Sequence, residues 1–292
     1  MDQFALDALE RITTRPQEPY RTFALAPLTP VLGAEISGLD LTKELTSEQE
    51  EEVKRAFLAH HVLVFRDQHL APEDHKRFAA LFGPLHPVAL PAEDSDPYIL
   101  EISADSKSRE VAGNGWHADG TADIEPSLGS MLHITRIPET GSGGDTMFAN
   151  MHLAYDLLSP ALRTFLDSLT ALHDGARPWQ LAGQTPPAEY DVPRTEHPVV
   201  VRHPETSRKL LFVNAPYTSR ITQLSAAEST ALLDLLHAHV AGTPLLHCRV
   251  RWQPNTLVFW DNRCVQHHAI WDYYPHSRYG RRIAIDGTRP RA

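Results

Sequence analysis

The sequence is poor in cysteine, contains no long apolar run and carries no excess of positive charge. Its 292 residues include two cysteines, Cys248 and Cys264, which are too few for a disulfide framework and suit a reducing compartment. No stretch approaches the roughly 20 apolar residues that span a bilayer. The acidic N-terminus does not resemble a signal peptide. We therefore expect a cytoplasmic protein that has no membrane partner.

The charge balance argues against a nucleic-acid partner bound through neutralisation of its phosphates. Lysine and arginine total 27 and aspartate and glutamate total 37, so the net charge is −10. Nucleic-acid binding usually relies on clustered basic side chains, and we expect none of it here. A small anionic ligand would instead need a local group of arginines. The composition is otherwise globular, with 42% hydrophobic and 22% charged residues,.

Short apolar segments separated by glycine and proline dominate the chain after residue 97. They are YILEI (98–102), SMLHIT (130–135), DTMFAN (145–150), HPVVVRH (197–203), KLLFVN (209–214), HCRVRW (247–252), TLVFW (256–260), CVQHHAI (264–270) and RRIAIDG (281–287). Many short strands joined by such turns predict a sandwich, a barrel or a jelly roll. Further strands are expected within 23–41 and at 61–65.

Helices are predicted at about 46–60, 72–82, 152–172 and 225–240. The first and last begin with capping-box patterns, Thr46 with Gln49 and Ser225 with Glu228,. Residues 174–196 are rich in proline and polar groups and show no period, which predicts a mobile lid or loop. No linker separates these segments, so we expect a single domain over residues 1–292.

The string Trp116-His117-Ala118-Asp119 carries the first chemical signal. In extended backbone, residues i and i+2 point to the same face, so His117 and Asp119 can converge on one point. They could supply two of the three ligands of a 2-His-1-carboxylate Fe(II) site. The pair alone is weak evidence, because the chain has 17 histidines and such spacings arise by chance.

The C-terminal region strengthens this signal. Two histidines, His267 and His268, could provide a third ligand, and Arg278, Arg281 and Arg282 follow on the next predicted strand. The planar guanidinium of arginine pairs with a carboxylate through two hydrogen bonds. The alternative from the residues alone is a solvated basic tail.

The sequence resembles the taurine dioxygenase and 2,4-dichlorophenoxyacetate dioxygenase family over nearly its whole length. The similar strings are GAEISGLDL (33–41), HVLVFRDQ (61–68), RFAALFGPLHP (77–87), WHADGT (116–121), GGDTMFANM (143–151), LFVNAPYTSRI (211–221), RWQPN (251–255) and WDNRCVQHHA (260–269). The resemblance implies a mainly β chain with helical inserts, folded as a double-stranded β-helix (a cupin-like jelly roll). It also implies an Fe(II)- and 2-oxoglutarate-dependent dioxygenase that uses O₂.

The resemblance assigns His117, Asp119 and His267 as the catalytic iron ligands. His267 is preferred to His268 because the family pattern is Gln-His-aromatic-Ala, and His267 directly follows Gln266. Adjacent side chains of a strand face opposite ways, so only one of the two histidines can point at the metal.

The resemblance also implies roles for five further residues. Thr146 and Arg278 would bind the distal carboxylate of 2-oxoglutarate, and Arg282 would hold an anionic substrate head. His86 and Tyr217 stand at positions that line the substrate site.

Two polar substrate contacts of the taurine enzyme are replaced here, by Ala89 and Gly115. This difference suggests an anionic substrate that is larger or less polar than taurine. Candidate substrates are sulfonates such as taurine, alkyl sulfates and aryloxyalkanoates. Hydroxylation beside the heteroatom would release sulfite, sulfate or a phenol and leave an aldehyde or oxo acid, with succinate and CO₂ formed from 2-oxoglutarate.

Two other functions use the same side chains. A zinc hydrolase could bind its metal and water through the same triad, although it would not need Thr146 and Arg278. A non-catalytic jelly-roll sensor of 2-oxoglutarate or another anion is the second. Family members are commonly dimers or tetramers, so we expect a homo-oligomer.

Overall fold

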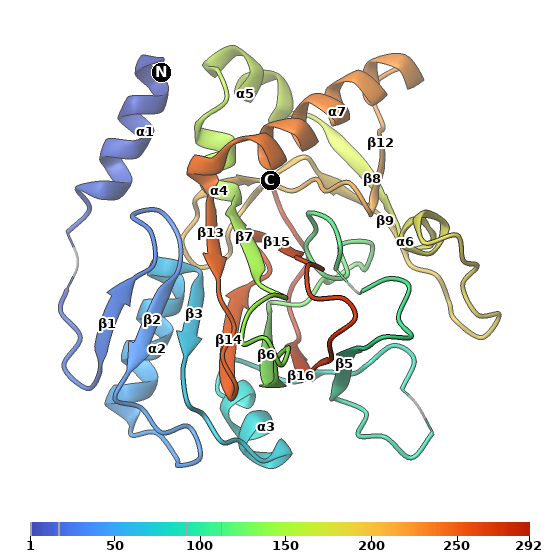
Figure 1. Cartoon of the computed structure of the whole chain (residues 1–292). Helices are drawn as coiled ribbons and strands as arrows, with labels where there is room; N and C mark the ends of the chain where they lie inside the picture. Colours follow the sequence, from blue (N-terminus) through green and yellow to red (C-terminus); the bar gives the residue numbers. More distant parts are fainter. Residues whose placement is uncertain (1, 17, 92, 112) are drawn as a thin grey trace.

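Two antiparallel sheets face each other in the computed structural model, which describes residues 2–16, 18–91, 93–111 and 113–292 (Figure 1). The larger sheet has the strand order β1-β2-β3-β14-β6-β16-β4, and β5 also pairs with β16. Its one parallel pair is β2 with β3. Its strands are β1 (Ala24–Pro27), β2 (Ala34–Ser37), β3 (Val62–Phe65), β4 (Leu85–His86), β5 (Leu100–Ala104), β6 (Gly129–Arg136), β14 (Thr256–Asp261) and β16 (Arg278–Ile285).

The smaller facing sheet has the order β13-β7-β15. It consists of β7 (Thr146–Asn150), β13 (His247–Val250) and β15 (Val265–Ala269). Phe148 of this sheet packs against Trp260 of β14, with ring centroids 5.8 Å apart. Two such facing sheets, with helices outside them, form the predicted jelly roll.

Alternating side chains on β14 divide the interior into two cores. Val258 and Trp260 point toward the smaller sheet, whereas Leu257 and Phe259 point toward helices on the other face. The ring of Phe259 stacks on Phe57, with a centroid distance of 3.9 Å. The central strand is therefore buried on both faces, which explains its continuous apolar sequence.

The predicted helix caps are present. The helix α2 (Ser47–His60) begins with Gln49 N donating to Thr46 Oγ1 (3.2 Å) and Thr46 N donating to Gln49 Oε1 (2.9 Å). The helix α7 (Ala226–Gly242) begins with the same box between Ser225 and Glu228,. Together with α3 (Pro72–Ala80), α2 covers the outer face of the larger sheet (Figure 1).

The prediction of one helix over 152–172 is wrong. The segment forms α4 (Met151–Asp156) and α5 (Pro160–Leu166), then begins strand β8 (Thr170–Asp174). Ser159 accepts a hydrogen bond from Leu162 N and caps a new helix, whose first residue Pro160 cannot donate within a continuous helix,. Two short helices can follow a curved surface that one straight helix could not cover.

The segment 174–196 is less irregular than predicted. It contains α6 (Ala176–Leu181) and the start of β9 (Arg194–Pro198), and apart from Gly175 only residues 182–193 lie between its helix and strands without forming either. β8 lies between β9 and β12 (Thr218–Ile221) in a small sheet, and β10 (Val200–Arg202) pairs with β11 (Lys209–Leu211). The predicted strand 197–203 is thus divided between β9 and β10.

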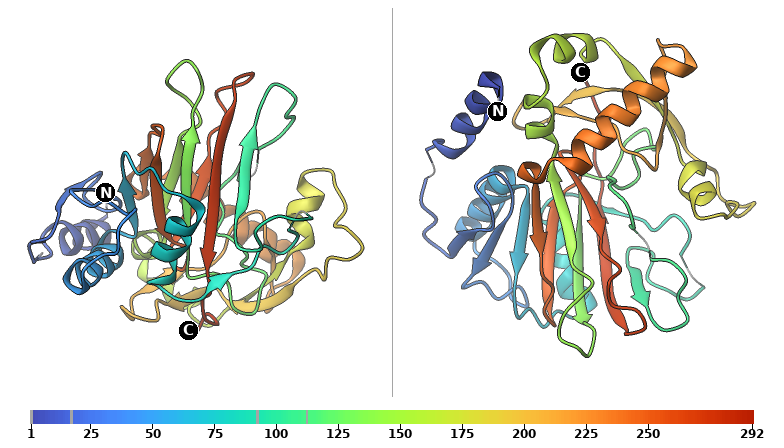
Figure 2. Two further views of the ribbon diagram at one scale, coloured as in Figure 1. Left: turned by 90° about the horizontal axis from the view of Figure 1, so that it is seen from below. Right: turned by 45° about the horizontal axis from the view of Figure 1, so that its top comes forward.

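The N-terminal helix α1 (Gln3–Thr13) has no counterpart among the predicted elements. It lies at one edge of the molecule in both views of Figure 2 and buries Ala5 and Ala8. A 3₁₀ turn, Pro244–Leu246, leads from α7 toward β13. Within the described ranges, no helix combines the length and apolar character needed to cross a membrane.

Candidate active site

Three side chains that could hold a metal ion, those of His117, Asp119 and His267, meet between the two sheets. Their donor atoms all lie within 4.8 Å of one another. Oδ1 of Asp119 is 3.7 Å from His117 Nε2 and 3.9 Å from His267 Nε2. These distances are too long for hydrogen bonds, so the donors converge without satisfying one another. Two imidazoles and one carboxylate form a donor set that suits Fe(II).

A backbone bridge holds the two histidines together although 150 positions separate them. His117 N donates to His267 O (3.0 Å), and His267 N donates to His117 O (2.7 Å). Their ring centroids lie 4.1 Å apart. His268 is outside this donor set, and its ring packs edge-on against Trp116. The alternation along β15 therefore turns His267, and not His268, toward Asp119.

The histidine protonation states leave lone pairs directed at the common point. Nδ1 of His117 lies 2.9 Å from Gly115 O. A carbonyl can only accept, so this nitrogen carries the hydrogen and Nε2 presents its lone pair. Burial lowers the pKa of His267 to about 3, and the neighbouring His117 adds to this effect. His267 is therefore neutral near pH 7, as a metal ligand must be.

Two residues that the sequence did not identify hold Asp119 in place. Asp119 N donates to Asn262 Oδ1 (2.7 Å), and Asn262 Nδ2 donates back to Asp119 O (2.9 Å). Ser130 Oγ donates to Asp119 Oδ2 (3.1 Å), which leaves Oδ1 facing the histidines. Asn262 lies within the WDNR string, but no local feature indicates its contact with residue 119.

Arg278 supplies a buried positive charge beside the triad. Its side chain is 6% exposed, and Nε and Nη2 have no hydrogen-bond partner among the described residues. Its guanidinium lies 5.2 Å from the ring centroid of Trp252, whose Nε1 donates to Thr146 Oγ1 (3.1 Å). It also lines a cavity of about 130 Å³ with Ala269 and Tyr273. Tyr273 forms a hydrogen bond with this guanidinium, and the unpartnered Nε and Nη2 suit a carboxylate ligand,.

A glycine makes room for this arginine. A Cβ at Gly144 would come within 2.8 Å of Arg278 Cδ, and the φ of Gly144 is +72°. Both the space and the backbone conformation therefore require glycine at this position.

Comparison with known proteins identifies the family. The family model "Taurine catabolism dioxygenase TauD, TfdA family" matches residues 24–284. The chain belongs to the TauD/TfdA family. An alkylsulfatase of Acinetobacter baylyi is 37% identical, with 94% of this chain and 89% of that protein aligned. The α-ketoglutarate-dependent 2,4-dichlorophenoxyacetate dioxygenase of Cupriavidus pinatubonensis is 35% identical, over 83% of this chain and 90% of that protein.

Solved structures agree with this assignment. A taurine dioxygenase from Burkholderia xenovorans superposes with a TM-score of 0.80 at 34% identity. The superposition covers 92% of this chain and 93% of the Burkholderia chain. The jelly-roll class is thereby confirmed. The chain is a 2-oxoglutarate-dependent dioxygenase of the TauD/TfdA family, whose chemistry uses Fe(II), 2-oxoglutarate and O₂. These relatives do not favour a zinc hydrolase or a non-catalytic sensor.

Both arginines expected to bind anions lie on one face of β16. Ile283 and Ile285 point into the core under the helices, so Arg278 and Arg282 point the other way,. The register with β6 shifts between Tyr279, opposite Arg136, and Gly280, opposite Ile134. The extra residue of this bulge is therefore on β6, and the alternation along β16 is kept.

Arg282 contacts the carboxylate of Asp119, the candidate metal ligand. Its Nη1 lies 2.8 Å from Asp119 Oδ1. Burial by itself would raise the pKa of Asp119, but Arg282 and the two histidines outweigh it and hold that pKa far below its usual range. The carboxylate is therefore ionised and available to a cation.

Tyr217 and His86 lie on the substrate side of this cluster. Burial, aided by the charge of Asp119, raises the pKa of Tyr217 to about 12, so its hydroxyl stays protonated. His86 lies opposite Ala284 in the β4–β16 ladder, one alternate position beyond Arg282 on the same face,. Its Nδ1 is 2.8 Å from Asp286 Oδ1, so this histidine already has a partner.

Proposed function

We propose that this TauD/TfdA dioxygenase hydroxylates a small organic anion at the carbon next to a heteroatom, and that alkyl sulfate esters are the first class to test. One observation carries the proposal: two arginines, Arg278 and Arg282, share one face of β16 beside a 2-His-1-carboxylate donor set. Such a pair can hold two different anions near one metal.

His117, Asp119 and His267 are the proposed metal ligands. The fit rests on the neutral imidazole of His267, the ionised carboxylate and the three donor atoms that already converge. When bound, Fe(II) with 2-oxoglutarate would supply the activation of O₂ and the oxidising power for the substrate carbon. Asn262 and Ser130 act as positioning residues, because they fix the backbone and the second oxygen of Asp119.

Arg278 and Thr146 are the proposed 2-oxoglutarate residues. The two unpartnered nitrogens of Arg278 suit a bidentate pair with the distal carboxylate,. Both residues contact Trp252, whose Nε1 donates to the Thr146 hydroxyl and leaves the hydroxyl hydrogen free to donate,. The buried surroundings exclude water from this charge pair.

Arg282, Tyr217 and His86 are the proposed substrate residues. A cation bound by Asp119 would compete with Arg282 for the carboxylate, and Arg282 would then be available to the substrate anion. The protonated hydroxyl of Tyr217 can donate a hydrogen bond to the same anion. Held by its charged head, an alkyl sulfate would present its ester carbon for hydroxylation. The hydroxylated carbon then loses sulfate and becomes an aldehyde.

The proposed substrate class rests on the relatives and on the substituted positions. The Acinetobacter baylyi relative is an alkylsulfatase, and the Cupriavidus pinatubonensis relative acts on an aryloxyalkanoate. Ala89 and Gly115 add no polar group to the site, so a longer alkyl chain is better accommodated than the amino group of taurine.

The deciding experiment is succinate formation with a panel of alkyl sulfates, sulfonates and aryloxyalkanoates. We expect Fe(II)-dependent turnover that is fastest with an alkyl sulfate and that releases equimolar sulfate and aldehyde. The His117→Ala variant is the negative control. Faster turnover of taurine or of an aryloxyalkanoate would reject the alkyl sulfate assignment, and the absence of turnover with every member would reject the proposed function.

We further propose that residues 1–292 act as one domain in a cytoplasmic homo-oligomer, a dimer or a tetramer. The two cores share the larger sheet, which supports a single folding unit. Cys248 and Cys264 are buried free thiols, which suits a reducing compartment,. Light scattering coupled to size-exclusion chromatography measures the oligomeric state.

A further inference from the structure

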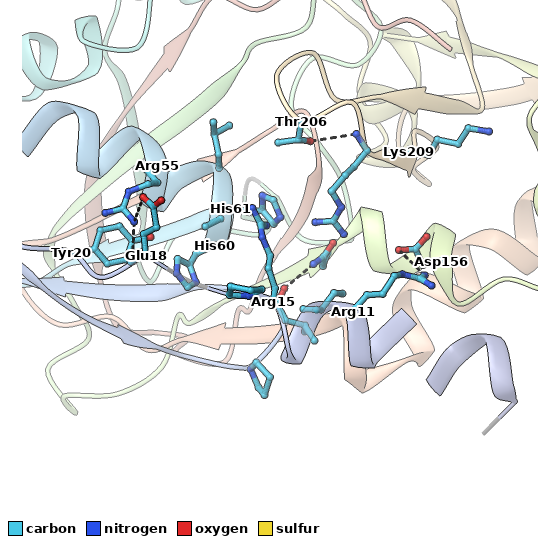
Figure 3. A pocket seen from close by; sticks show the side chains of 18 residues that line it. Arg11, Arg15, Glu18, Tyr20, Arg55, His60, His61, Asp156, Thr206 and Lys209 are labelled. Atoms are coloured by element: carbon cyan, nitrogen blue, oxygen red, sulfur yellow. Dashed lines mark hydrogen bonds and ion pairs between the residues drawn. The ribbon is translucent and has the colours of Figure 1, made fainter. Parts of the chain in front are cut away.

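A second cavity lies between the N-terminal helix and the rest of the chain. It has a volume of about 770 Å³ and opens between α1, the end of α2 and the turn before β11. None of the residues assigned above to the metal, 2-oxoglutarate or the substrate lines it. Figure 3 shows Arg11 of α1 and Arg15, which follows this helix, on one side, with Thr206 and Lys209 on the facing side.

The lining is strongly basic although the whole chain is acidic. Five basic residues line the cavity, Arg11, Arg15, Arg55, Arg208 and Lys209, and only two acidic residues, Glu18 and Asp156. Several of these cations are already engaged. Lys209 pairs with Asp167 (2.6 Å), and Arg55 donates to two backbone carbonyls and to Glu52.

Two of the arginines have no partner. The guanidinium groups of Arg15 and Arg208 make no hydrogen bond or salt bridge to any described residue of the chain. Arg208 is partly buried, and its position is electrostatically unfavourable. Burial lowers its pKa, Asp156 partly opposes this change, and Arg15 and Arg11 lower it further. Asp156 supplies only part of the compensating charge, so a ligand anion would stabilise this partly buried cation further,.

A buried histidine also lines this cavity. His60 is 6% exposed, and its Nε2 has no hydrogen-bond partner among the described residues. That nitrogen is closed off from the cavity, so a ligand oxygen would reach the two arginines and not His60 Nε2.

We propose that this cavity binds a phosphorylated small molecule through Arg15 and Arg208. The excess of basic side chains favours a multiply charged group, and arginine pairs with phosphate through two hydrogen bonds. The volume exceeds what a single inorganic anion fills. Ile12, Val31, Leu58 and Tyr20 line the remainder and suit the organic part of such a ligand.

The test uses isothermal titration calorimetry with fructose 1,6-bisphosphate as the probe and inorganic phosphate as the singly phosphorylated comparison. The full-length enzyme is first saturated with Mn(II) and N-oxalylglycine, which occupy the proposed active site. We expect saturable binding of the bisphosphate, at least about tenfold tighter than that of phosphate. Arg208→Ala and Arg15→Ala should each weaken it roughly tenfold or more. Arg136→Ala removes an exposed arginine elsewhere and should leave it unchanged.

The test distinguishes binding at this cavity from binding at the active site and from a purely structural role of Arg208. Loss of binding in Arg282→Ala but not in Arg208→Ala would assign the probe to the active site and overturn the proposal. Absence of binding to the unsubstituted enzyme would also overturn it. Without ligand, Arg208→Ala should melt no lower than the unsubstituted protein, because it removes an unpaired charge. A large drop in its melting temperature would instead make Arg208 a structural residue.

Discussion

The guanidinium of Arg282 forms a salt bridge with the carboxylate of Asp119, with Nη1 2.8 Å from Oδ1. One arginine thereby links the proposed substrate site to the proposed metal site. The carboxylate cannot serve both partners equally, so a bound cation should release Arg282 toward an anionic substrate.

Arg282→Ala should therefore raise the KM for the anionic substrate by one to two orders of magnitude and should not weaken Mn(II) binding. The reason is that Arg282 competes with the cation for Asp119 but contributes no donor atom to it. Substrate kinetics and Mn(II) titration by electron paramagnetic resonance measure the two effects. A loss of Mn(II) affinity would show that the arginine supports the metal site instead.

Arg278→Ala should weaken 2-oxoglutarate binding by roughly two to three orders of magnitude. Leaving a buried charge unpaired costs about 3–5 kcal/mol, and each factor of ten corresponds to about 1.4 kcal/mol. Arg281→Ala is the matched control, because its charge acts on His75 and His133 on the opposite face of β16. Titration of 2-oxoglutarate decides the matter, and equal losses in both variants would contradict the assignment.

His117→Ala and Asp119→Ala should each abolish Fe(II)-dependent succinate formation, whereas His268→Ala should retain most of it. His268 contacts Trp116 and lies outside the converging donor set. Metal content and succinate are measured on all three variants. Retention of iron by His267→Ala together with its loss from His268→Ala would reverse our choice of ligand.

Residues 182–193 should exchange amide hydrogens quickly in the free enzyme and more slowly once metal, 2-oxoglutarate and substrate are bound. Tyr190 lies close enough to Tyr217 to contribute to the raised pKa of Tyr217. This segment therefore lies near one of the proposed substrate residues. Residues 176–181 form α6 and should be protected from the start. Hydrogen exchange followed by mass spectrometry tests this, and unchanged exchange in the complex would argue against a lid.

The stability of the protein should fall as the pH decreases from about 6.5 toward 3. Burial lowers the pKa of His61, His75, His173 and His267 to about 3 and that of His60 to about 4, against an ordinary value of 6.5. In this range the unfolded chain binds protons that the folded chain does not. The free energy of unfolding therefore decreases by up to about 1.4 kcal/mol per pH unit for each histidine.

Urea unfolding at pH 7.5 and pH 5.5 measures this change. His75→Phe should reduce the pH dependence by the contribution of one histidine, because His75 is buried and its Nε2 has no partner among the described residues. His69→Phe, at an exposed histidine, is the control. If the free energy of unfolding of the His75 variant changed by the same amount between pH 7.5 and pH 5.5 as that of the unsubstituted protein, His75 would not be a source of the pH dependence.

Local patterns in the sequence were sufficient for several elements. The capping boxes at Thr46 and Ser225 predicted the starts of α2 and α7, because a cap depends on residues within one turn,. The apolar runs predicted β3, β6, β7, β13, β14, β15 and β16 for the same reason. The break between α4 and α5 was missed although Ser159 and Pro160 mark it locally. The helices α1 and α6 were not predicted either.

The candidate site divides in the same way. The family strings and strand alternation in the sequence by themselves determined the jelly-roll class and the choice of His117, Asp119, His267, Arg278 and Arg282. Only the tertiary structure brought Asn262 and Ser130 to Asp119, and paired Arg282 with that same carboxylate. Only the folded chain likewise placed Arg15 and Arg208, 193 positions apart, at one cavity. Hydrogen bonds and charge interactions act over a few ångströms in space, and no pattern of neighbouring residues records which distant segments folding will place within that range.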